Sequence, residues 1–317
     1  MLLTVAMPVY NNQRFLPAAI ESVLGQSLRD FELLVCDDGS TDGSLAIARR
    51  YEQADNRVRV LAHPNRGVCE NMNDAIAHAR AEWVACMHGD DVMLPKRLER
   101  QIAFVRANPD IDLTSCLVQW IDDRDRAVGY SRCHLTTREA VKRVIAEDGV
   151  LAFPHPGAMF RKSVVESTGG YRKQAFPTED VDLWNRIADA GHGVLVQPEI
   201  LLRYRIHSDS TSTSKAKRVM RNLRWVEACI QARHGGRPEP TIEQFLQSRR
   251  EAGLLRRLDD QRIDIGHAAF QSAINYYASS RYHLMAPSML TALLLRPGLF
   301  LPRILARVTR HSTGKAA

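Results

Sequence analysis

Short apolar runs alternate with longer segments of helical periodicity from Leu2 to Val118. The stretch Leu2–Met7 is apolar throughout, which is typical of a strand buried on both faces of a parallel sheet. Between Phe15 and Leu28 apolar residues recur every three or four positions, which predicts a helix. Further strands are predicted at 31–36, 58–62, 83–87 and 111–118, and helices at 44–53, 68–80 and 95–107. This alternation predicts a doubly wound α/β domain with a mainly parallel sheet.

The second half of the chain is less regular. A strand is predicted at 153–160, an amphipathic helix at 179–190, and short strands at 194–196 and 200–204. The polar run at 208–214 is typical of a linker. The sequence beyond it has helical periodicity and is basic. We therefore expect one α/β domain over 1–214 and a helical region over 215–317.

Composition and cysteine usage narrow the class of protein. Apolar residues make up 45% of the 317 residues and charged residues 25%, which is ordinary for a globular protein and excludes a disordered chain. Among the six cysteines, Cys36, Cys86 and Cys116 lie in apolar runs, and no Cys-x-x-Cys pair occurs. Buried thiols indicate a reducing compartment. The N-terminus has no basic region of a signal peptide, and Leu284–Leu295 is too short to span a bilayer, so we expect a cytoplasmic protein.

Charge is divided unevenly along the chain. The segment Lys215–Ala317 holds 18 Lys/Arg and 7 Asp/Glu, out of 43 and 36 in the whole chain. The remainder is therefore mildly acidic, although the whole chain has a net charge of +7. A basic segment of this kind points to a polyanionic partner, such as nucleic acid or an anionic membrane face. The alternative is a solvated helical face.

Polar clusters follow the ends of separate predicted strands, at Pro8–Asn12, Asp37–Asp42 and His88–Asp91. The carboxyl ends of strands in an open α/β sheet border the ligand crevice, so we expect these clusters to meet. Neither phosphate-binding glycine motif of nucleotide hydrolases and dinucleotide oxidoreductases is present. Carboxylates such as Asp90 and Asp91 suit a hard divalent cation, and Arg66 suits a base or a phosphate.

The order and spacing of these motifs resemble family-2 glycosyltransferases of the bacterial cell-surface polysaccharide type. The motifs are Pro-Val-Tyr-Asn at 8–11, Asp-Asp-Gly-Ser-Thr-Asp at 37–42, Asn-Arg-Gly at 65–67, Gly-Asp-Asp at 89–91 and Glu-Asp at 179–180. The resemblance covers about residues 1–210. It implies a GT-A fold, a doubly wound mixed sheet flanked by helices. It further implies that nucleotide-sugar binding lies in about 1–110 and the acceptor side in about 111–214, ahead of a C-terminal helical extension.

The resemblance also implies an activity. A sugar would pass from a nucleotide-diphosphate donor, expected to be a UDP-sugar, to the hydroxyl of a glycan or lipid-linked acceptor with inversion. Polysaccharide, O-antigen or capsule assembly is the expected setting. The alternative is a non-catalytic protein that binds sugar nucleotides or glycans on the same fold.

Residue roles follow from the matched motifs. The nucleotide sugar would be bound by Pro8, Tyr10, Asn11, Asp38, Arg66 and Asp90. Asp91 with Asp90 would hold a divalent cation, Mn²⁺ or Mg²⁺, and Asp180 would be the catalytic base. In isolation, Glu179 and Asp180 could equally complement a helix macrodipole.

One element departs from the family pattern, which often reads Asp-x-Asp-Asp where this chain has His88-Gly89-Asp90-Asp91. Histidine ligates Mn²⁺ more readily than Mg²⁺, so His88 is either a further metal ligand or a strand-end residue without that role. His207, in a Tyr-Arg-x-His segment, is a second candidate ligand, the alternative being a solvated loop.

Further residues are predicted on the acceptor side or in a lid: His155, Glu179, Trp184 and Arg205. Trp184 lies at helical spacing and is equally a core candidate.

The sequence of the C-terminal region is compatible with more than one binding partner. Basic residues stand beside apolar faces up to the segment Phe300–Val308, which suits a peripheral helix on the anionic inner face of the plasma membrane. The alternative is packing on the catalytic domain or on another subunit in a homo-oligomer. Nucleic acid is not expected as a partner, because no zinc-finger, RNA-binding or helix-turn-helix signature occurs.

Overall fold

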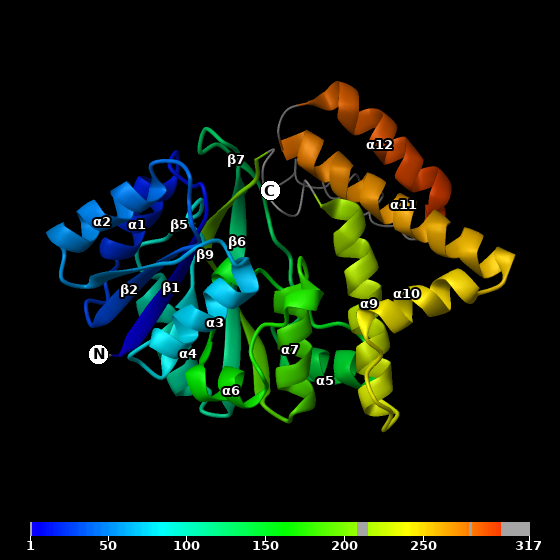
Figure 1. Ribbon diagram of the computed structural model, residues 1–317, viewed down its shortest axis with the longest axis horizontal. Coiled ribbons are helices and arrows are strands. Elements are labelled where there is room, and N and C mark those ends of the chain that lie inside the picture. The colour runs from blue at the N-terminus through cyan, green and yellow to red at the C-terminus, as the bar shows by residue number, and fades with distance from the viewer. Residues whose placement is uncertain (1, 208–214, 279–280, 299–317) are drawn as a thin grey trace, which may run out of the picture. The chain divides into compact units, whose positions relative to one another are not determined.

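The computed structural model describes residues 2–207, 215–278 and 281–298 (Figure 1). The chain divides into two compact units. The first comprises Met1–Arg205 together with Cys229–Glu239, and the second comprises Ile206–Ala228 together with Pro240–Ala317. The expected boundary at residue 214 lies outside the described residues, as does the segment 300–308.

The first unit is built on one mixed sheet with the strand order β3-β2-β1-β4-β8-β6-β9-β5, in which β7 also pairs with β6 (Figure 1). The strands are β1 (Leu3–Val9), β2 (Phe31–Asp37), β3 (Val58–Ala62), β4 (Trp83–Cys86), β5 (Val92–Met93), β6 (Ile111–Ile121), β7 (Ala127–Tyr130), β8 (Met159–Arg161) and β9 (Gly193–Arg205). β1 pairs in parallel with β2 and β4, whereas β8 lies antiparallel between β4 and β6. The expected doubly wound mixed sheet is confirmed.

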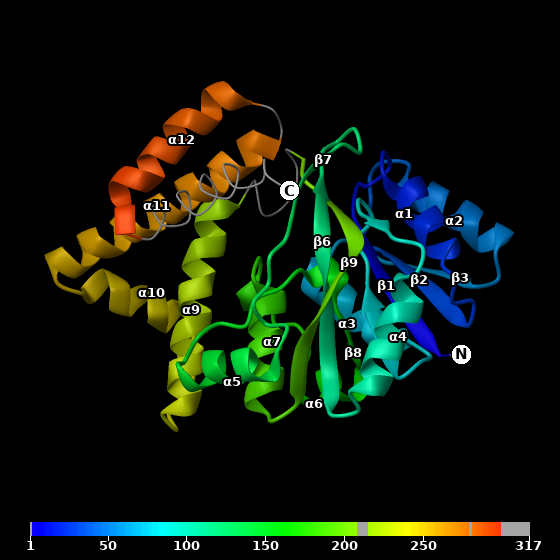
Figure 2. The same cartoon turned by 180° about the vertical axis from the view of Figure 1, so that it is seen from behind.

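Helices cover both faces of this sheet. They are α1 (Leu16–Leu24), α2 (Ser44–Ala54), α3 (Val68–His78), α4 (Arg97–Ala107), α5 (Arg138–Ala146), α6 (Lys162–Ser167) and α7 (Glu179–Asp189). Side chains of α1, α2 and α4 form one buried cluster, and those of α3, α5, α6 and α7 form the other. Alternate residues of β2 serve the two clusters, with Leu33 and Val35 in the first and Leu34 and Cys36 in the second. Figure 1 shows α3 and α7 on one face, and the reverse view in Figure 2 shows α4 on the other.

Two sequence predictions need correction here. The strand predicted at 153–160 is wrong, because only Met159–Arg161 is extended and His155–Gly157 form a 3₁₀ turn. Pro154 and Pro156 flank His155 and lack the N–H groups that a ladder requires. The two short strands predicted at 194–196 and 200–204 are parts of the single strand β9, and the register with β6 shifts beside Pro198.

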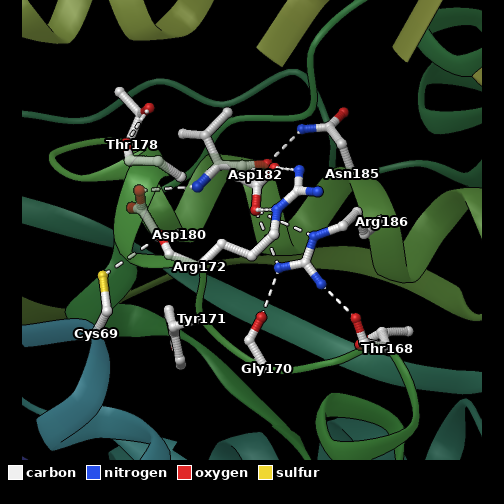
Figure 3. Close-up of polar contacts among 12 residues, drawn as sticks. Cys69, Thr168, Gly170, Tyr171, Arg172, Thr178, Asp180, Asp182, Asn185 and Arg186 are labelled. Carbon is white, nitrogen blue, oxygen red and sulfur yellow. Dashed lines mark hydrogen bonds and ion pairs between the residues drawn. The ribbon is translucent and has the colours of Figure 1, made fainter. Parts of the chain in front are cut away.

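A buried carboxylate fixes α7 to the loop before it (Figure 3). Asp182 is buried, and it accepts hydrogen bonds from Arg172 Nε at 2.9 Å and Arg186 Nε at 3.1 Å. A further bond from Arg172 Nη2 completes a bidentate pair. Arg186 also donates to the backbone oxygens of Thr168 and Gly170. We call Asp182, Arg172 and Arg186 the α7 clamp.

The α7 clamp continues into the last part of α9 (Ala216–His234) and the residues after it. Arg172 Nη1 donates to Glu239 at 2.6 Å, and Arg233 Nη1 donates to the same carboxylate at 2.6 Å. Arg233 also pairs with Asp189 at the end of α7, at 2.6 Å. The segment Cys229–Glu239 is thus tied to both ends of α7, and Arg233 is neutralised within the first unit.

The second unit is helical. Besides the first part of α9 it contains α10 (Ile242–Glu251), α11 (Leu254–Ala278) and α12 (Tyr282–Leu295), of which α11 and α12 pack against each other. Arg224 and Arg249 are paired with Asp260 and Asp264, at 2.7 Å for Arg224–Asp260 and 2.8 Å for Arg249–Asp264. Among the described helices, none combines the length and the hydropathy needed to cross a bilayer.

Replacing Asp182 by Asn should destabilise the first unit, because the two arginines of the α7 clamp then face a neutral amide in a buried setting. We expect a loss of about 3 kcal/mol in the free energy of unfolding, measured by urea denaturation with circular dichroism. The matched control is Asp123→Asn, which removes the exposed ion pair with Arg14 and should cost less than about 1 kcal/mol. Equal midpoints for the two variants would contradict the assigned role of the clamp.

Candidate functional site

The motif residues gather at one edge of the sheet because their strands end level with one another. Val9 of β1 is the register partner of Asp37 of β2, and Asp37 is the partner of Ala62 of β3. The segments that follow these strands, together with the loop after β4, therefore lie at the same edge. Pro8 fits inside β1 because the pairing with β4 has already ended at Ala6.

Asp38 organises the predicted nucleoside side. This buried carboxylate accepts the backbone N–H of Arg66 at 2.8 Å and that of Gly67 at 2.9 Å. Gly67 has a φ of +91°, a conformation that favours glycine, and α3 begins immediately after it. The structure thus brings Asp38 and Arg66 together, through main-chain contacts. The guanidinium of Arg66 pairs with Asp74 of α3.

Tyr10 and Asn11 follow β1 and differ in their surroundings. Asn11 adopts a left-handed φ of 54°, and its Oδ1 accepts the N–H of Thr41 at 2.8 Å, which joins the loops after β1 and β2. Tyr10 is 49% exposed. Its ring is therefore available to a ligand, whereas the amide oxygen of Asn11 is occupied in supporting the loop.

The loop after β4 carries an acidic cluster, which we define as His88, Asp90 and Asp91. One possible ligand atom from each lies within 4.8 Å of the others. Asp91 is buried, and burial is the main cause that raises the pKa of its carboxyl well above the ordinary value, with the neighbouring Asp90 adding to the shift. Asp91 Oδ1 accepts the N–H of Arg205 at 2.8 Å, but Oδ2 has no hydrogen-bond partner within the described residues. A buried carboxylate oxygen of this kind is costly, and a hard cation would satisfy it.

Arg205 is bonded to the acidic cluster. Its side chain is buried at the end of β9, where Nε donates to the Asp90 carbonyl at 2.7 Å and Nη2 donates to Asp125 at 2.7 Å. The guanidinium also lies over the ring of Phe15, 4.5 Å from its centroid. These contacts hold the side chain at the end of β9, and a role of Arg205 on the acceptor side or in a lid stays a prediction. His207 belongs to the second unit, so its role as a ligand stays a prediction.

His155 lies against the acidic cluster and is not on an open acceptor surface. Its Nδ1 is 2.8 Å from His88 Nε2, and its Nε2 is 2.8 Å from the hydroxyl of Tyr171. Burial lowers the pKa of both histidines, most strongly that of His155. We call His88, His155 and Tyr171 the histidine–tyrosine chain.

Trp184 is a core residue. Its side chain is fully buried and stacks on His155 and on Phe153, with ring centroids 5.9 Å and 5.4 Å apart. The expectation that Trp184 contacts an acceptor is therefore corrected, because no part of its ring reaches the surface.

Asp180 stands at the start of α7, next to Glu179, and both side chains are half-buried. Burial is the main cause that raises the pKa of Asp180 to about 6, and the negative charge of Asp182 adds to it. Its Oδ1 accepts the N–H of Val181 at 2.8 Å (Figure 3). A carboxylate whose pKa lies near neutrality is suited to accept a proton.

Sequence reasoning missed several supporting residues. Arg97, at the start of α4, is fully buried and donates to the Cys86 carbonyl at the end of β4, at 2.9 Å. Tyr171 and Asp182 were not identified as supports either. No local motif marks these three positions, because the groups that they contact are brought to them only by the tertiary fold.

Comparison with known proteins identifies the family. The chain matches the family model described as "Glycosyl transferase family 2" over residues 4–169, which is more than half of its length. It is 31% identical over 215 residues to EpsE of Bacillus subtilis, which carries a glycosyltransferase name; the match covers 65% of this chain and 74% of EpsE. It is also 28% identical to the O-antigen biosynthesis glycosyltransferase WbnJ of Escherichia coli, covering 67% of this chain and 83% of WbnJ.

Solved structures agree in fold. TarS 1–349 of S. aureus, in complex with UDP-GlcNAc, gives a TM-score of 0.58 at 15% identity, covering 94% of this chain and 92% of TarS 1–349. The mannosyltransferase PcManGT from Pyrobaculum calidifontis, in complex with GDP-Man and Mn²⁺, gives a TM-score of 0.56 at 19% identity, covering 94% and 79%. The expected GT-A fold is thus confirmed, and the chain belongs to glycosyl transferase family 2, whose members transfer glycosyl groups.

Proposed function

We propose that this glycosyltransferase moves a sugar from a nucleoside diphosphate donor, a UDP-sugar, to the hydroxyl of a glycan or lipid-linked acceptor, with inversion at the anomeric carbon. The observation that carries the proposal is the acidic cluster after β4, with its unsatisfied Asp91 oxygen, in the same unit as a carboxyl of raised pKa at Asp180.

Several features support the donor assignment. The exposed ring of Tyr10 offers a surface on which a nucleobase can stack, and Asp38 orders the neighbouring Arg66 loop. TarS and PcManGT were solved with UDP-GlcNAc and GDP-Man, which supports a sugar nucleotide on this fold. Relatives named for O-antigen and amylovoran biosynthesis support a polysaccharide product.

A divalent cation fits the residues present. Asp90 and Asp91 would hold it, and Mn²⁺ is the ion found with PcManGT. When bound, such a cation would offset the negative charge that develops on the diphosphate leaving group.

Asp180 supplies the base. Its carboxylate takes the proton of the acceptor hydroxyl as the oxygen forms its bond to the anomeric carbon and the bond to the diphosphate breaks. Inversion is proposed because this single displacement needs no second carboxylate as nucleophile. The fold disfavours the ionised form of Asp180, and such a carboxylate has no use in a protein that only binds sugar nucleotides. The raised pKa of Asp180 therefore favours catalysis over the non-catalytic alternative.

We further propose that the second unit associates with an anionic membrane face. Leu254 and Leu255, at the start of α11, are 67% and 84% exposed, and Leu258 one turn later is also exposed. Arg256 and Arg257 stand between them, and neither is paired with a carboxylate in the part of the chain that the structure describes. Adjacent leucine and arginine side chains suit a lipid surface with anionic headgroups.

Replacing Asp180 by Asn should lower sugar transfer by about 100-fold or more while donor binding persists, because the variant cannot accept the acceptor proton. The release of UDP as product and the binding of UDP are measured, with the exposed Glu166→Gln in α6 as the matched control. Transfer at the wild-type rate would exclude Asp180 as the base.

The Asp180→Asn variant should also be more stable than the wild type above pH 6. The fold raises the pKa of Asp180, so the ionised form lowers the free energy of unfolding there. This loss disappears as the pH falls from about 6 towards the ordinary carboxyl pKa.

The pH profile of kcat/KM should rise about tenfold per unit at low pH and level off above about 6, because only the ionised form of Asp180 accepts a proton. The profile is measured with saturating cation in overlapping buffers, and donor binding is followed in parallel. A profile that stays flat between pH 5 and 7 would contradict the assignment.

The double variant Leu254→Ser/Leu255→Ser should bind vesicles of phosphatidylglycerol about tenfold more weakly than the wild type, because exposed apolar area is lost. Cosedimentation at low and high salt is the measurement. Ile200→Ser, at a half-exposed apolar position of β9, is the matched control. Unchanged binding of the double variant would remove the membrane proposal.

A further inference from the structure

The histidine–tyrosine chain runs from the acidic cluster into the core. His88 Nε2 lies 2.8 Å from His155 Nδ1, and His155 Nε2 lies 2.8 Å from the Tyr171 hydroxyl. The hydroxyl is also 3.9 Å from Cys86 Sγ. Each short contact needs one hydrogen between its two heavy atoms, so the positions of the hydrogens along the chain are linked.

The order of these hydrogens is set at the buried end. The Tyr171 hydroxyl has one hydrogen, which it can donate to His155 Nε2 at 2.8 Å or to a sulfur at 3.9 Å. In the second case the 2.8 Å contact would instead be an N–H···O bond from His155 Nε2 to the hydroxyl oxygen. The O–H···N order is the better one, because a phenol hydroxyl is a stronger donor than a neutral imidazole N–H, and an imidazole nitrogen is a stronger acceptor than a phenol oxygen or a sulfur. With Nε2 accepting, neutral His155 carries its hydrogen on Nδ1 and donates it to His88 Nε2.

The same order determines what His88 offers to the site. With Nε2 accepting, neutral His88 carries its hydrogen on Nδ1. That nitrogen is 4.0 Å from Asp91 Oδ2, the buried oxygen without a hydrogen-bond partner in the described chain. A protonated Nδ1 cannot ligate a cation but can donate to an anionic oxygen.

We propose that Tyr171 and His155 are positioning residues that hold His88 as a neutral Nδ1–H donor to an anionic oxygen, so that His88 is not a cation ligand. The proposal rests on the proposed function in placing the donor diphosphate and a cation at this edge of the sheet. It accounts for a histidine where the family often has an aspartate: Asp90 and Asp91 hold the cation, and His88 donates to an oxygen of the diphosphate or of Asp91.

Two kinds of variant separate this role from simple packing. Tyr171→Phe keeps the ring that packs edge-on against His155 and Trp184 but removes the hydroxyl. His155→Phe keeps a flat ring beside Trp184 but removes the donor to His88, whereas His155→Asn retains an amide N–H near the position of Nδ1. Tyr51→Phe, which removes a hydroxyl bonded to Glu21 elsewhere in the unit, is the matched control.

The first measurement is the ¹⁵N spectrum of the His88 ring in metal-free protein, assigned with His88→Gln. We expect the wild type, Tyr51→Phe and His155→Asn to show hydrogen on Nδ1. Tyr171→Phe and His155→Phe should show a mixture of tautomers or hydrogen on Nε2. A wild-type ring protonated on Nε2, or a ring unaffected by Tyr171→Phe and His155→Phe, would overturn the proposal.

The second measurement is the affinity for Mn²⁺ without nucleotide. We expect Asp91→Asn to lower it more than tenfold and His88→Gln to change it less than threefold, since only the carboxylates are ligands. An equal loss in both variants would overturn the proposal by making His88 a ligand. Absence of Mn²⁺ binding by the wild type would instead count against the cation of the proposed function, and the ¹⁵N result would still decide the tautomer.

The third measurement, UDP affinity in the presence of EDTA, distinguishes the two acceptors. A loss of about tenfold in His88→Gln assigns the hydrogen bond to the diphosphate. An unchanged affinity assigns it to Asp91. Either result is consistent with a donor at Nδ1, whereas a gain in affinity would contradict it.

Discussion

The α7 clamp is the interaction on which the positions of both Asp180 and the histidine–tyrosine chain depend. Asp182 is two residues after Asp180, and Arg172 directly follows Tyr171. By holding Arg172 and Arg186, the buried carboxylate fixes the start of α7 and also the backbone that carries the Tyr171 hydroxyl (Figure 3). The proposed base, Asp180, and the histidine–tyrosine chain are thereby held by one ion-pair network. Buried pairs of this kind give geometric specificity more than net stability, which suits a site whose groups must keep their relative positions.

Burial performs two different tasks around this clamp. At Asp180 it raises the pKa to about 6, so that the carboxylate is ionised at neutral pH yet remains able to take a proton. At His155 it favours the neutral ring, which can donate with one nitrogen and accept with the other. The aromatic cluster around Trp184 packs against His155 and Tyr171, so one desolvated region serves the histidine–tyrosine chain. Trp184 therefore packs beside the histidine–tyrosine chain as a fully buried core residue.

The fold could be predicted largely from the sequence, because the spacing of apolar residues shows where a strand or helix with one buried face begins and ends. Val58–Ala62 is an example, since the limits predicted from the sequence are those of β3 in the structure. The site could be predicted in part, because Asp38, Asp90 and Asp91 follow strand ends and such ends converge in a parallel sheet. The surroundings of Arg205 and His155 could not be predicted because they come from long-range packing: Arg205 reaches Asp90 across 115 positions and His155 reaches His88 across 67. Periodicity carries no information about such pairs.

The distribution of charge can now be interpreted residue by residue. Part of the basic character after residue 214 is neutralised locally, since Arg224 and Arg249 face Asp260 and Asp264, and Arg233 faces Glu239 and Asp189. These arginines are committed to packing, so a high count of basic residues does not by itself indicate a polyanion. Arg256 and Arg257 differ because they project beside exposed leucines at the start of α11. A membrane interaction would therefore depend on this short segment rather than on the net charge of the region, and it should respond to loss of the leucines as well as to salt.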